Sequence, residues 1–230
     1  MFNKGKIIAA AAMALAVNSA MAADSVDVKV IGTIVPAACK PALSGGATID
    51  YGTIKASAIA QDDYTVLPVK SLNFSINCDA PAKVALKSID VRQGTEAKPV
   101  GVKLNGTTIG DSTAVSGLGL ADSKKIGAYT AILKTASVTL DGATTGVDSI
   151  LSKDMATTWV KNGTLAEGAW IGGTHSWLYS FAAAGSLTPV AFTTLTGTLD
   201  VQAAINKGSE LDLTKAVHLD GMSTIELYYL

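Results

Sequence analysis

Alternation of apolar and polar residues at both ends of the chain is the feature that most restricts its fold. Near the start, the even positions carry Val26, Val28, Val30, Gly32 and Ile34, whereas the odd positions are mostly polar. The last residues alternate in the same way, with Ile225, Leu227 and Tyr229 on one parity. Successive side chains point to opposite faces in a β-strand, so we predict a strand with one buried face at each end.

Shorter alternating runs fill much of the chain between these ends. They lie at residues 49–51, 72–76, 84–91, 177–181 and 190–205, and turn residues such as Asp141-Gly142 stand among them. Near Ser88 the apolar residues switch from even-numbered to odd-numbered positions, which predicts a β-bulge. A second switch occurs within residues 190–205. Many short strands with turn residues between them predict an all-β chain folded as an antiparallel β-sandwich.

The middle region, residues 94–173, is rich in Gly, Thr, Ala and Ser and only weakly periodic. We predict strands there at residues 100–104, 129–133 and 138–140, and a helical turn within residues 149–161. No long amphipathic helix and no internal repeat is predicted. The middle region therefore enlarges a single sandwich domain that covers residues 39–230.

Residues 1–22 have the three parts of a secretory signal peptide. Lys4 and Lys6 precede an uncharged run at residues 7–17, and Ala20-Met21-Ala22 provides small residues for cleavage. A transmembrane anchor is the alternative, but this run is too short for a hydrocarbon core that needs about 20 residues. We therefore predict export of a chain that begins at Ala23, and no later segment is predicted to span a membrane.

The two cysteines, Cys39 and Cys78, both lie in the exported part of the chain. An oxidising compartment allows them to pair, and we predict a disulfide between them. Two free thiols or a two-ligand metal site are the alternatives. No cluster of His, Cys or acidic residues lies near either cysteine in the sequence, so we predict no metal site.

Composition and motifs argue against several classes of function. The net charge is −1, so no basic surface for nucleic acid is predicted. The sequence contains no motif typical of a hydrolase, a nucleotide-binding loop or a zinc enzyme. His175 stands beside Ser176, but neighbouring residues of a strand point to opposite faces, so this pair is not predicted to act as nucleophile and base. We therefore predict no catalytic residue, no enzyme activity and no cofactor.

Three tryptophans are close together in the sequence: Trp159, Trp170 and Trp177. Aromatic side chains in a secreted β-sandwich can form a platform for a sugar. They can equally fill a core, because each removes a large apolar area from water. We favour the core and keep ligand binding at these three residues as the alternative.

The sequence resembles the pilins of the chaperone–usher pathway, and in particular divergent fimbrial-like proteins of Gram-negative bacteria. The resemblance rests on Ala23-Asp24-Ser25, Gly32 placed seven residues before Cys39, Ile49-Asp50-Tyr51-Gly52, the Phe74-Ser75-Ile76-Asn77-Cys78 strand and the aromatic penultimate residue Tyr229. It covers the front and the back of the chain, whereas the middle region has no counterpart.

This resemblance implies an immunoglobulin-like sandwich that lacks its last strand. Residues 23–38 would then be a donor strand that enters the groove of a neighbouring subunit through Val26, Val28, Val30, Gly32 and Ile34. Ile225, Leu227 and Tyr229 would border the chain's own groove and pair with a chaperone. The implied partners are a periplasmic chaperone, an outer-membrane usher and neighbouring subunits. The implied role is structural, in cell adhesion, first in the periplasm and then in a cell-surface fimbrium.

Two alternatives stay open at this point. Residues 23–38 would be an ordinary first strand if they fold back on their own sandwich. The middle region would supply the missing strand if the protein is self-complemented, and the chain would then be a periplasmic or surface module that binds a glycan or a protein.

Overall fold

The computed structural model describes residues 28–33, 37–143, 146–162, 168–173 and 175–230. It divides into two units, Met1–Val35 and Pro36–Leu230. In the first unit, residues 28–33 form neither a helix nor a strand. The predicted signal peptide, Val26 and Ile34 lie outside the described residues. The second unit contains all the described strands.

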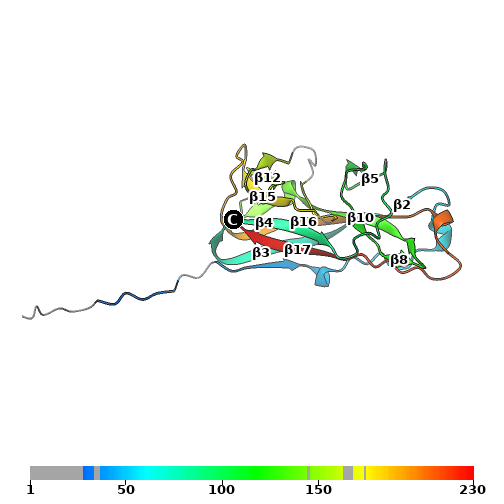
Figure 1. Ribbon diagram of the computed structural model, residues 1–230, viewed down its shortest axis with the longest axis horizontal. Coiled ribbons are helices and arrows are strands. Elements are labelled where there is room, and N and C mark those ends of the chain that lie inside the picture. The colour runs from blue at the N-terminus through cyan, green and yellow to red at the C-terminus, as the bar shows by residue number, and fades with distance from the viewer. Residues whose placement is uncertain (1–27, 34–36, 144–145, 163–167, 174) are drawn as a thin grey trace, which may run out of the picture. The chain divides into compact units, whose positions relative to one another are not determined.

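The larger sheet has eight strands, all paired antiparallel. Its main path runs in the order β1 (Cys39–Leu43), β3 (Lys70–Ala82), β16 (Phe192–Ile205), β10 (Gly127–Lys134) and β14 (Gly168–Trp170). Short strands join this path: β2 (Thr65–Val66) and β11 (Thr139–Leu140) pair with β16, and β7 (Ser116–Gly117) pairs with β10. The two long strands, β3 and β16, form the centre of this sheet (Figure 1).

The smaller sheet has five antiparallel strands. Their order is β13 (Val160–Lys161), β12 (Val147–Ser152), β15 (Leu178–Ala183), β4 (Val84–Asp90) and β17 (Ser223–Tyr229). Two small hairpins pair β5 (Lys103–Leu104) with β6 (Thr107–Thr108) and β8 (Leu120–Ala121) with β9 (Lys124–Lys125). The described helices are single 3-10 turns: η1 (Gly45–Ala47), η2 (Ala56–Ala58), η3 (Thr135–Ser137) and η4 (Gly208–Glu210).

One hydrophobic core joins the two sheets. Phe74, Ile76 and Leu195 of the larger sheet belong to the same buried cluster as Leu86 and Phe181 of the smaller sheet. Burial of these side chains, at about 1.5–3 kcal/mol each, holds the sheets face to face. The predicted all-β, antiparallel β-sandwich is confirmed. The predicted disulfide is confirmed as well, because Cys39 of β1 is bonded to Cys78 of β3.

The two predicted strand irregularities had different outcomes. In β16 the register with β3 shifts between Phe192 and Thr194, as the change of parity predicted. The bulge predicted near Ser88 is wrong, since β4 pairs with β17 without a shift from Val84 to Asp90. The inward-facing positions of β4 continue without a break, but the last two carry polar residues: Ser88 is 0% exposed and Asp90 is 4% exposed. The Asp90 carboxylate is satisfied by the backbone N–H groups of Gly117 and Arg92, which explains a buried acid on this strand.

The middle region is built into both sheets. It contributes β10 and β14 to the larger sheet and β12 and β13 to the smaller one. The helical turn predicted within residues 149–161 is wrong at both ends of that range, because β12 and β13 occupy them. Asp154 organises the turn between these strands by accepting hydrogen bonds from Ser152 Oγ and Thr158 N.

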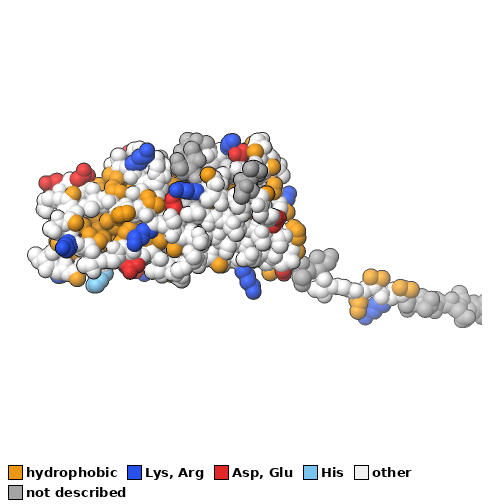
Figure 2. Space-filling model, turned by 180° about the vertical axis from the view of Figure 1, so that it is seen from behind, with side chains coloured by type: hydrophobic (Ala, Val, Ile, Leu, Met, Phe, Trp, Pro, Cys, Tyr) orange, Lys and Arg blue, Asp and Glu red, His pale blue; other side chains and the backbone are white. Residues whose placement is uncertain are grey.

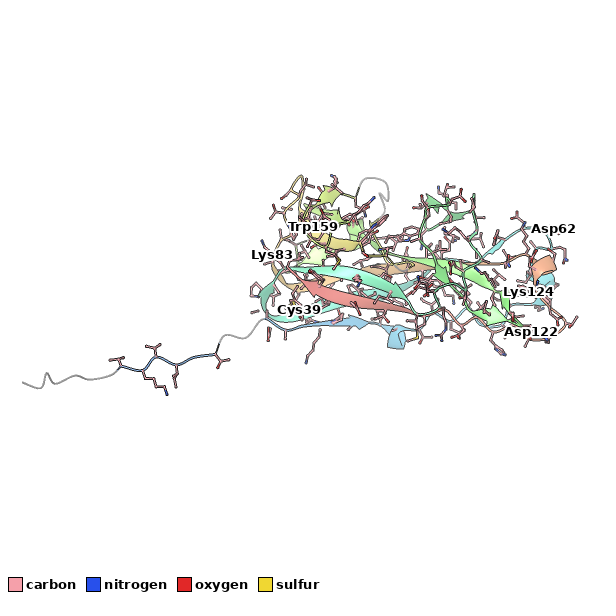
Figure 3. All side chains as sticks on the ribbon, viewed as in Figure 1. Cys39, Asp62, Lys83, Asp122, Lys124 and Trp159 are labelled. Atoms are coloured by element: carbon pink, nitrogen blue, oxygen red, sulfur yellow. A yellow bond between two sulfur atoms is a disulfide. The ribbon has the colours of Figure 1, made fainter. Side chains whose placement is uncertain are left out.

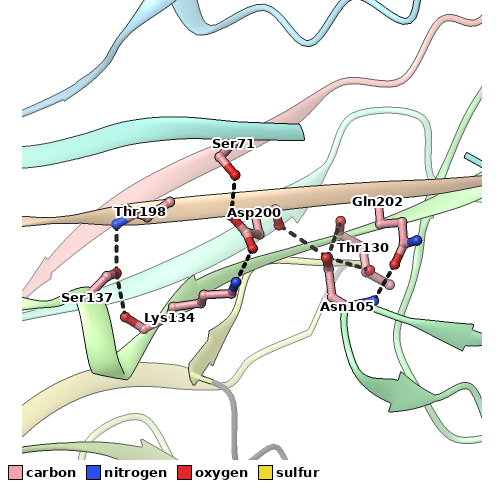
Figure 4. A network of polar contacts seen from close by, with 8 residues as sticks. All are labelled: Ser71, Asn105, Thr130, Lys134, Ser137, Thr198, Asp200 and Gln202. Carbon is pink, nitrogen blue, oxygen red and sulfur yellow. Dashed lines mark hydrogen bonds and ion pairs between the residues drawn. The ribbon is translucent and has the colours of Figure 1, made fainter. Parts of the chain in front are cut away.

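A polar network attaches the β5–β6 hairpin to the larger sheet (Figure 4). The Asn105 amide nitrogen Nδ2 donates to the backbone oxygens of Thr130 and Asp200, and the Asn105 backbone N–H donates to Gln202 Oε1. The buried Asp200 carboxylate accepts from Ser71 Oγ and pairs with Lys134 Nζ. These bonds lie on β10 and β16, so the middle region is joined to the centre of the sheet.

Candidate functional site

An open groove with a volume of about 1220 Å³ lies between the two sheets of the Pro36–Leu230 unit. One wall is β1 together with residues 47–59, and the other is residues 211–225, which lead into β17. The floor consists of inward-facing side chains of β3, β10 and β16, which are Leu72, Phe74, Tyr129, Ala131, Leu199, Val201, Ala203 and Ile205. The groove is therefore an apolar channel above the hydrophobic core.

Both walls include the last strand of a sheet. β1 ends the main path of the larger sheet, and β17 ends the order of the smaller sheet. Among the described residues, no strand pairs with the second edge of either one. The strands of the middle region, β14 and β13, lie at the opposite ends of the two sheet orders. The middle region thus does not fill this groove in the described part of the chain.

The edge of β17 presents its backbone to the groove. Met222 O accepts from Val91 N, and Leu230 N donates to Lys83 O, so the even-numbered residues of this strand face β4. In an antiparallel ladder the alternate residues face the other way, and these are Ser223, Ile225, Leu227 and Tyr229. Ile225 and Leu227 also pack their side chains against the core. Of the three predicted groove-border residues, Ile225 lines the groove, whereas Leu227 and Tyr229 continue the same strand edge beyond it.

Just beyond one end of the groove, a hydrogen bond joins the two strands whose other residues form its walls, and this bond closes that end. The Cys39 backbone N–H of β1 donates to Tyr229 Oη of β17, at 2.8 Å. Figure 3 shows Cys39 and Lys83 at this end of the unit and Asp62 and Asp122 at the other end. β1 therefore runs away from the closed end, whereas β17 runs towards it.

Specific contacts hold the wall formed by residues 211–222. Asp220 forms a two-point ion pair with the Arg92 guanidinium, at 2.9 Å for each contact. This guanidinium lowers the pKa of the Asp220 carboxyl. Ser223 Oγ lies 2.5 Å from Tyr129 Oη on the floor, and burial raises the pKa of Tyr129. At Gly221 an added Cβ would lie 2.7 Å from the Tyr129 ring, so only glycine lets the chain pass so close.

The predicted donor residues that the structure describes are exposed. Val28 is 84% exposed, Val30 is 91% exposed and the neighbouring Ile31 is 80% exposed. At Gly32, no atom lies within 4 Å of the position that a Cβ would take. Three large apolar side chains within four residues are thus left in water, at a cost of about 1.5–3 kcal/mol each relative to burial.

The aromatic region around the three tryptophans is largely internal. Trp170 is 1% exposed, and its Nε1 donates to Ala114 O at 2.7 Å, so its ring offers no face to a ligand. Trp177 is half-buried, and Lys153 Nζ lies 4.3 Å from its ring centre. His175 packs on Trp177, and burial lowers the pKa of His175. Trp159 is half-buried as well. Packing thus accounts for Trp170, the most buried of the three.

The described residues were also searched for a metal-binding cluster and for a membrane-spanning helix. Among the described residues, no group of three or more His, Cys, Asp or Glu side chains is placed to hold a metal ion. Within the same residues, no helix is both long and apolar enough to cross a membrane. Figure 2 shows one face of the molecule, on which hydrophobic side chains gather in one area among lysines and arginines.

Sequence reasoning missed the floor of the groove and one residue of its wall. Leu199 and Val201 were assigned to a strand, but their place beneath the groove follows from pairing with β3, which is distant in sequence. Pro41 lies on the groove edge of β1 and received no role. No strand is predicted at β1 from the sequence, although a proline is compatible with a strand at the edge of a sheet.

Comparison with known proteins places the chain in a family. A model of the family described as "Protein of unknown function (DUF1120)" matches residues 28–130. "Uncharacterized protein YhcF" of Escherichia coli K12 is 30% identical over an alignment of 224 residues that covers 92% of this chain and 93% of that protein. "Protein GltF" of the same organism is 32% identical over 268 residues, covering all of this chain and 99% of that protein. No solved structure matches. The chain therefore belongs to the DUF1120 family.

Proposed function

We propose that this protein is a structural, fimbrial-like subunit that is exported and then assembled by donor-strand exchange. In this process a segment of one subunit completes the sandwich of the next. A periplasmic chaperone and an outer-membrane usher would assist assembly, and the product would contribute to cell adhesion. The proposal rests on the resemblance to pilins together with the groove between β1 and β17.

The open groove is the observation that carries this proposal. It leaves apolar side chains of β3, β10 and β16 beneath a channel and two strand edges beside it. Open strand edges and apolar surface favour aggregation, so a protein of this kind needs an occupant for its groove. An extended segment is the occupant that satisfies both the apolar floor and the backbone groups of an edge strand.

The N-terminal extension supports the nature of this occupant. Val28 and Val30 share one parity, as a strand with one apolar face requires, and both are exposed. Insertion into the groove of another copy would bury them and add backbone hydrogen bonds. Because each copy then carries both a donor segment and an acceptor groove, association is head-to-tail and does not close on itself. The product would be a fibre.

Deletion of residues 23–31 tests the proposal. The mature protein and the deletion variant would be compared by size-exclusion chromatography with light scattering and by thermal unfolding. The proposal predicts that the mature protein forms head-to-tail oligomers, whereas the variant loses them and keeps the melting temperature that the mature protein has when it is diluted to a monomer. Oligomers of equal size in both proteins, or a mature protein that stays monomeric at every concentration tested, would contradict it.

A further inference from the structure

We propose that a second pocket of this protein binds an acidic sugar, meaning a saccharide unit that carries a carboxylate, sulfate or phosphate group. This pocket, called the lysine pocket below, has a volume of about 370 Å³ and lies between β9 and η4. Its lining includes Tyr64, Lys124, Lys125, Asn206, Lys207 and Glu210. It is lined by different residues from those of the groove, so the inference goes beyond the proposed function and does not depend on it.

Positive charge gathers around the lysine pocket, although the net charge of the whole chain is −1. Three ammonium groups and one carboxylate line the pocket, which leaves an excess of two positive charges. The ion pairs within the described part of the chain use other cations, and none of them includes Lys124, Lys125 or Lys207. The pocket has the volume of a small-molecule site, and its charge favours an anionic group.

The larger sheet brings two of these lysines opposite each other. The antiparallel register of β10 with β16 continues beyond the two strands, since Asn206 N donates to Ile126 O. One residue further along this register, Lys125 is opposite Lys207. Like charges opposite each other on neighbouring strands repel, so the folded chain keeps these two lysines together at a cost in stability. An anionic group bound between them would offset that cost.

A buried amide holds the two lysines in this arrangement. Asn206 is 9% exposed, its Nδ2 donates to Lys125 O at 2.9 Å, and its Oδ1 accepts from Lys207 N at 2.9 Å. The side chain of Lys125 is held as well, because its Nζ donates to Glu96 O at 3.2 Å. The backbone of both lysines is therefore positioned before an anionic group arrives, which lowers the entropic cost of binding.

Glu210 and Tyr64 indicate a sugar and not a bare anion. The Glu210 carboxylate would repel an inorganic anion, but it can accept hydrogen bonds from sugar hydroxyls. It lies near Tyr64, whose pKa is raised by burial and, to a smaller extent, by the charge of Glu210. The Tyr64 hydroxyl donates to Lys98 O at 3.0 Å, which holds the half-buried ring at the pocket. An acidic sugar offers its anionic group to the lysines, hydroxyls to Glu210 and an apolar face to the ring.

Calorimetric titration of the mature protein with three probes tests this inference. The probes are tetragalacturonate, which carries a carboxylate on each sugar, the neutral tetrasaccharide of galactose, and inorganic phosphate. We expect tetragalacturonate to bind at least about tenfold more tightly than either of the other two, because it alone satisfies both the lysines and Glu210. Absence of tetragalacturonate binding, or equal binding of the neutral tetrasaccharide, would overturn the inference. Phosphate bound as tightly as tetragalacturonate would overturn the assignment to a sugar.

Two double variants locate the binding. Lys125→Gln together with Lys207→Gln removes the two opposed charges, and we expect tetragalacturonate affinity to fall by about tenfold or more. Lys40→Gln together with Lys83→Gln changes two exposed lysines outside the pocket and should alter the affinity by less than about twofold. Figure 3 shows Lys83 and Lys124 at opposite ends of this unit. Equal losses from both double variants would mean that tetragalacturonate binds through the overall charge, which would contradict the site.

Thermal unfolding and the donor peptide provide two controls. Without a probe, the Lys125 and Lys207 double variant should melt no lower than the parent, because it loses a repulsion, so that lost binding is not lost folding. The peptide of residues 23–38 should leave the affinity for tetragalacturonate unchanged, because the groove and the lysine pocket are lined by different residues. Competition between the peptide and tetragalacturonate would contradict a separate site. Failure of the peptide to bind at all would overturn the proposed function and leave this inference standing.

Discussion

The two ends of this chain carry the same alternating pattern and have different structures. At the C-terminal end, Ile225 and Leu227 form part of β17 and pack against the core. At the N-terminal end, Val28 and Val30 are exposed and belong to no strand. Alternation thus indicates that a segment can form a strand with one apolar face. It does not indicate which strand, in which molecule, that segment pairs with.

The disulfide should have the largest effect on stability, because it holds the groove wall that follows the N-terminal extension. Replacing Cys39 and Cys78 by alanine together removes a closure between residues 39 positions apart. We expect the free energy of unfolding to fall by about 4 kcal/mol. Urea denaturation of the oxidised protein and the double variant measures this difference. A loss below about 1 kcal/mol would show that β1 is held in place without the bond.

A charge within the C-terminal run should have the next largest effect. Leu227→Asp places a carboxylate among residues that pack on the core, and we expect a loss of about 3 kcal/mol in the free energy of unfolding. Glu226→Asp, at the neighbouring exposed position, is the matched control and should change stability by less than about 0.5 kcal/mol. Similar stabilities of the two variants would remove the distinction between the faces of β17.

The bond that closes the groove should contribute less. Tyr229→Phe removes the hydroxyl that accepts from the Cys39 N–H and leaves the ring in place. We expect a loss of about 0.5–1.5 kcal/mol, the usual net value of one hydrogen bond. Chemical denaturation monitored by circular dichroism would measure it. Tyr228→Phe serves as the control on the same strand, and an equal loss from both variants would assign no special role to the closed end.

The same kind of charge in the N-terminal run should have the smallest effect on stability. Val30→Asp alters a side chain that is 91% exposed, so at a protein concentration low enough for both proteins to be monomers we expect the melting temperature to stay within about 2 °C of the parent. The variant should nevertheless fail to form oligomers, because the carboxylate would have to enter an apolar groove. Thermal unfolding and light scattering separate the two effects. A clear fall in melting temperature would mean that this segment packs on its own sandwich.

The fold class could be predicted from sequence because it depends on local alternation. Runs such as Leu72, Phe74 and Ile76 have the period of a half-buried strand wherever they pair. Prediction was wrong at Ser88, where the inward position is polar and is satisfied by contacts that depend on the tertiary structure. A bulge and a buried polar residue change the apolar parity in the same way, so the sequence alone did not separate them.

The candidate site could be predicted only in part. The resemblance to pilins predicts that Ile225, Leu227 and Tyr229 border a groove, and all three lie on an edge strand of which only the first part, including Ile225, lines the groove. Phe74 and Leu199 meet beneath that groove because β3 pairs with β16, a contact between segments far apart in sequence. Pairing of distant strands depends on the whole chain, and local periodicity does not determine it.

Addition of the donor peptide tests the open groove most directly. The mature protein would be studied by size-exclusion chromatography with light scattering and by thermal unfolding, with and without a synthetic peptide of residues 23–38. We predict that the protein self-associates alone and becomes a monomer with a sharper, higher melting transition when the peptide fills the groove. A stable monomer whose melting is unchanged by the peptide would contradict donor-strand exchange and would show that the sandwich is complete without a donated strand.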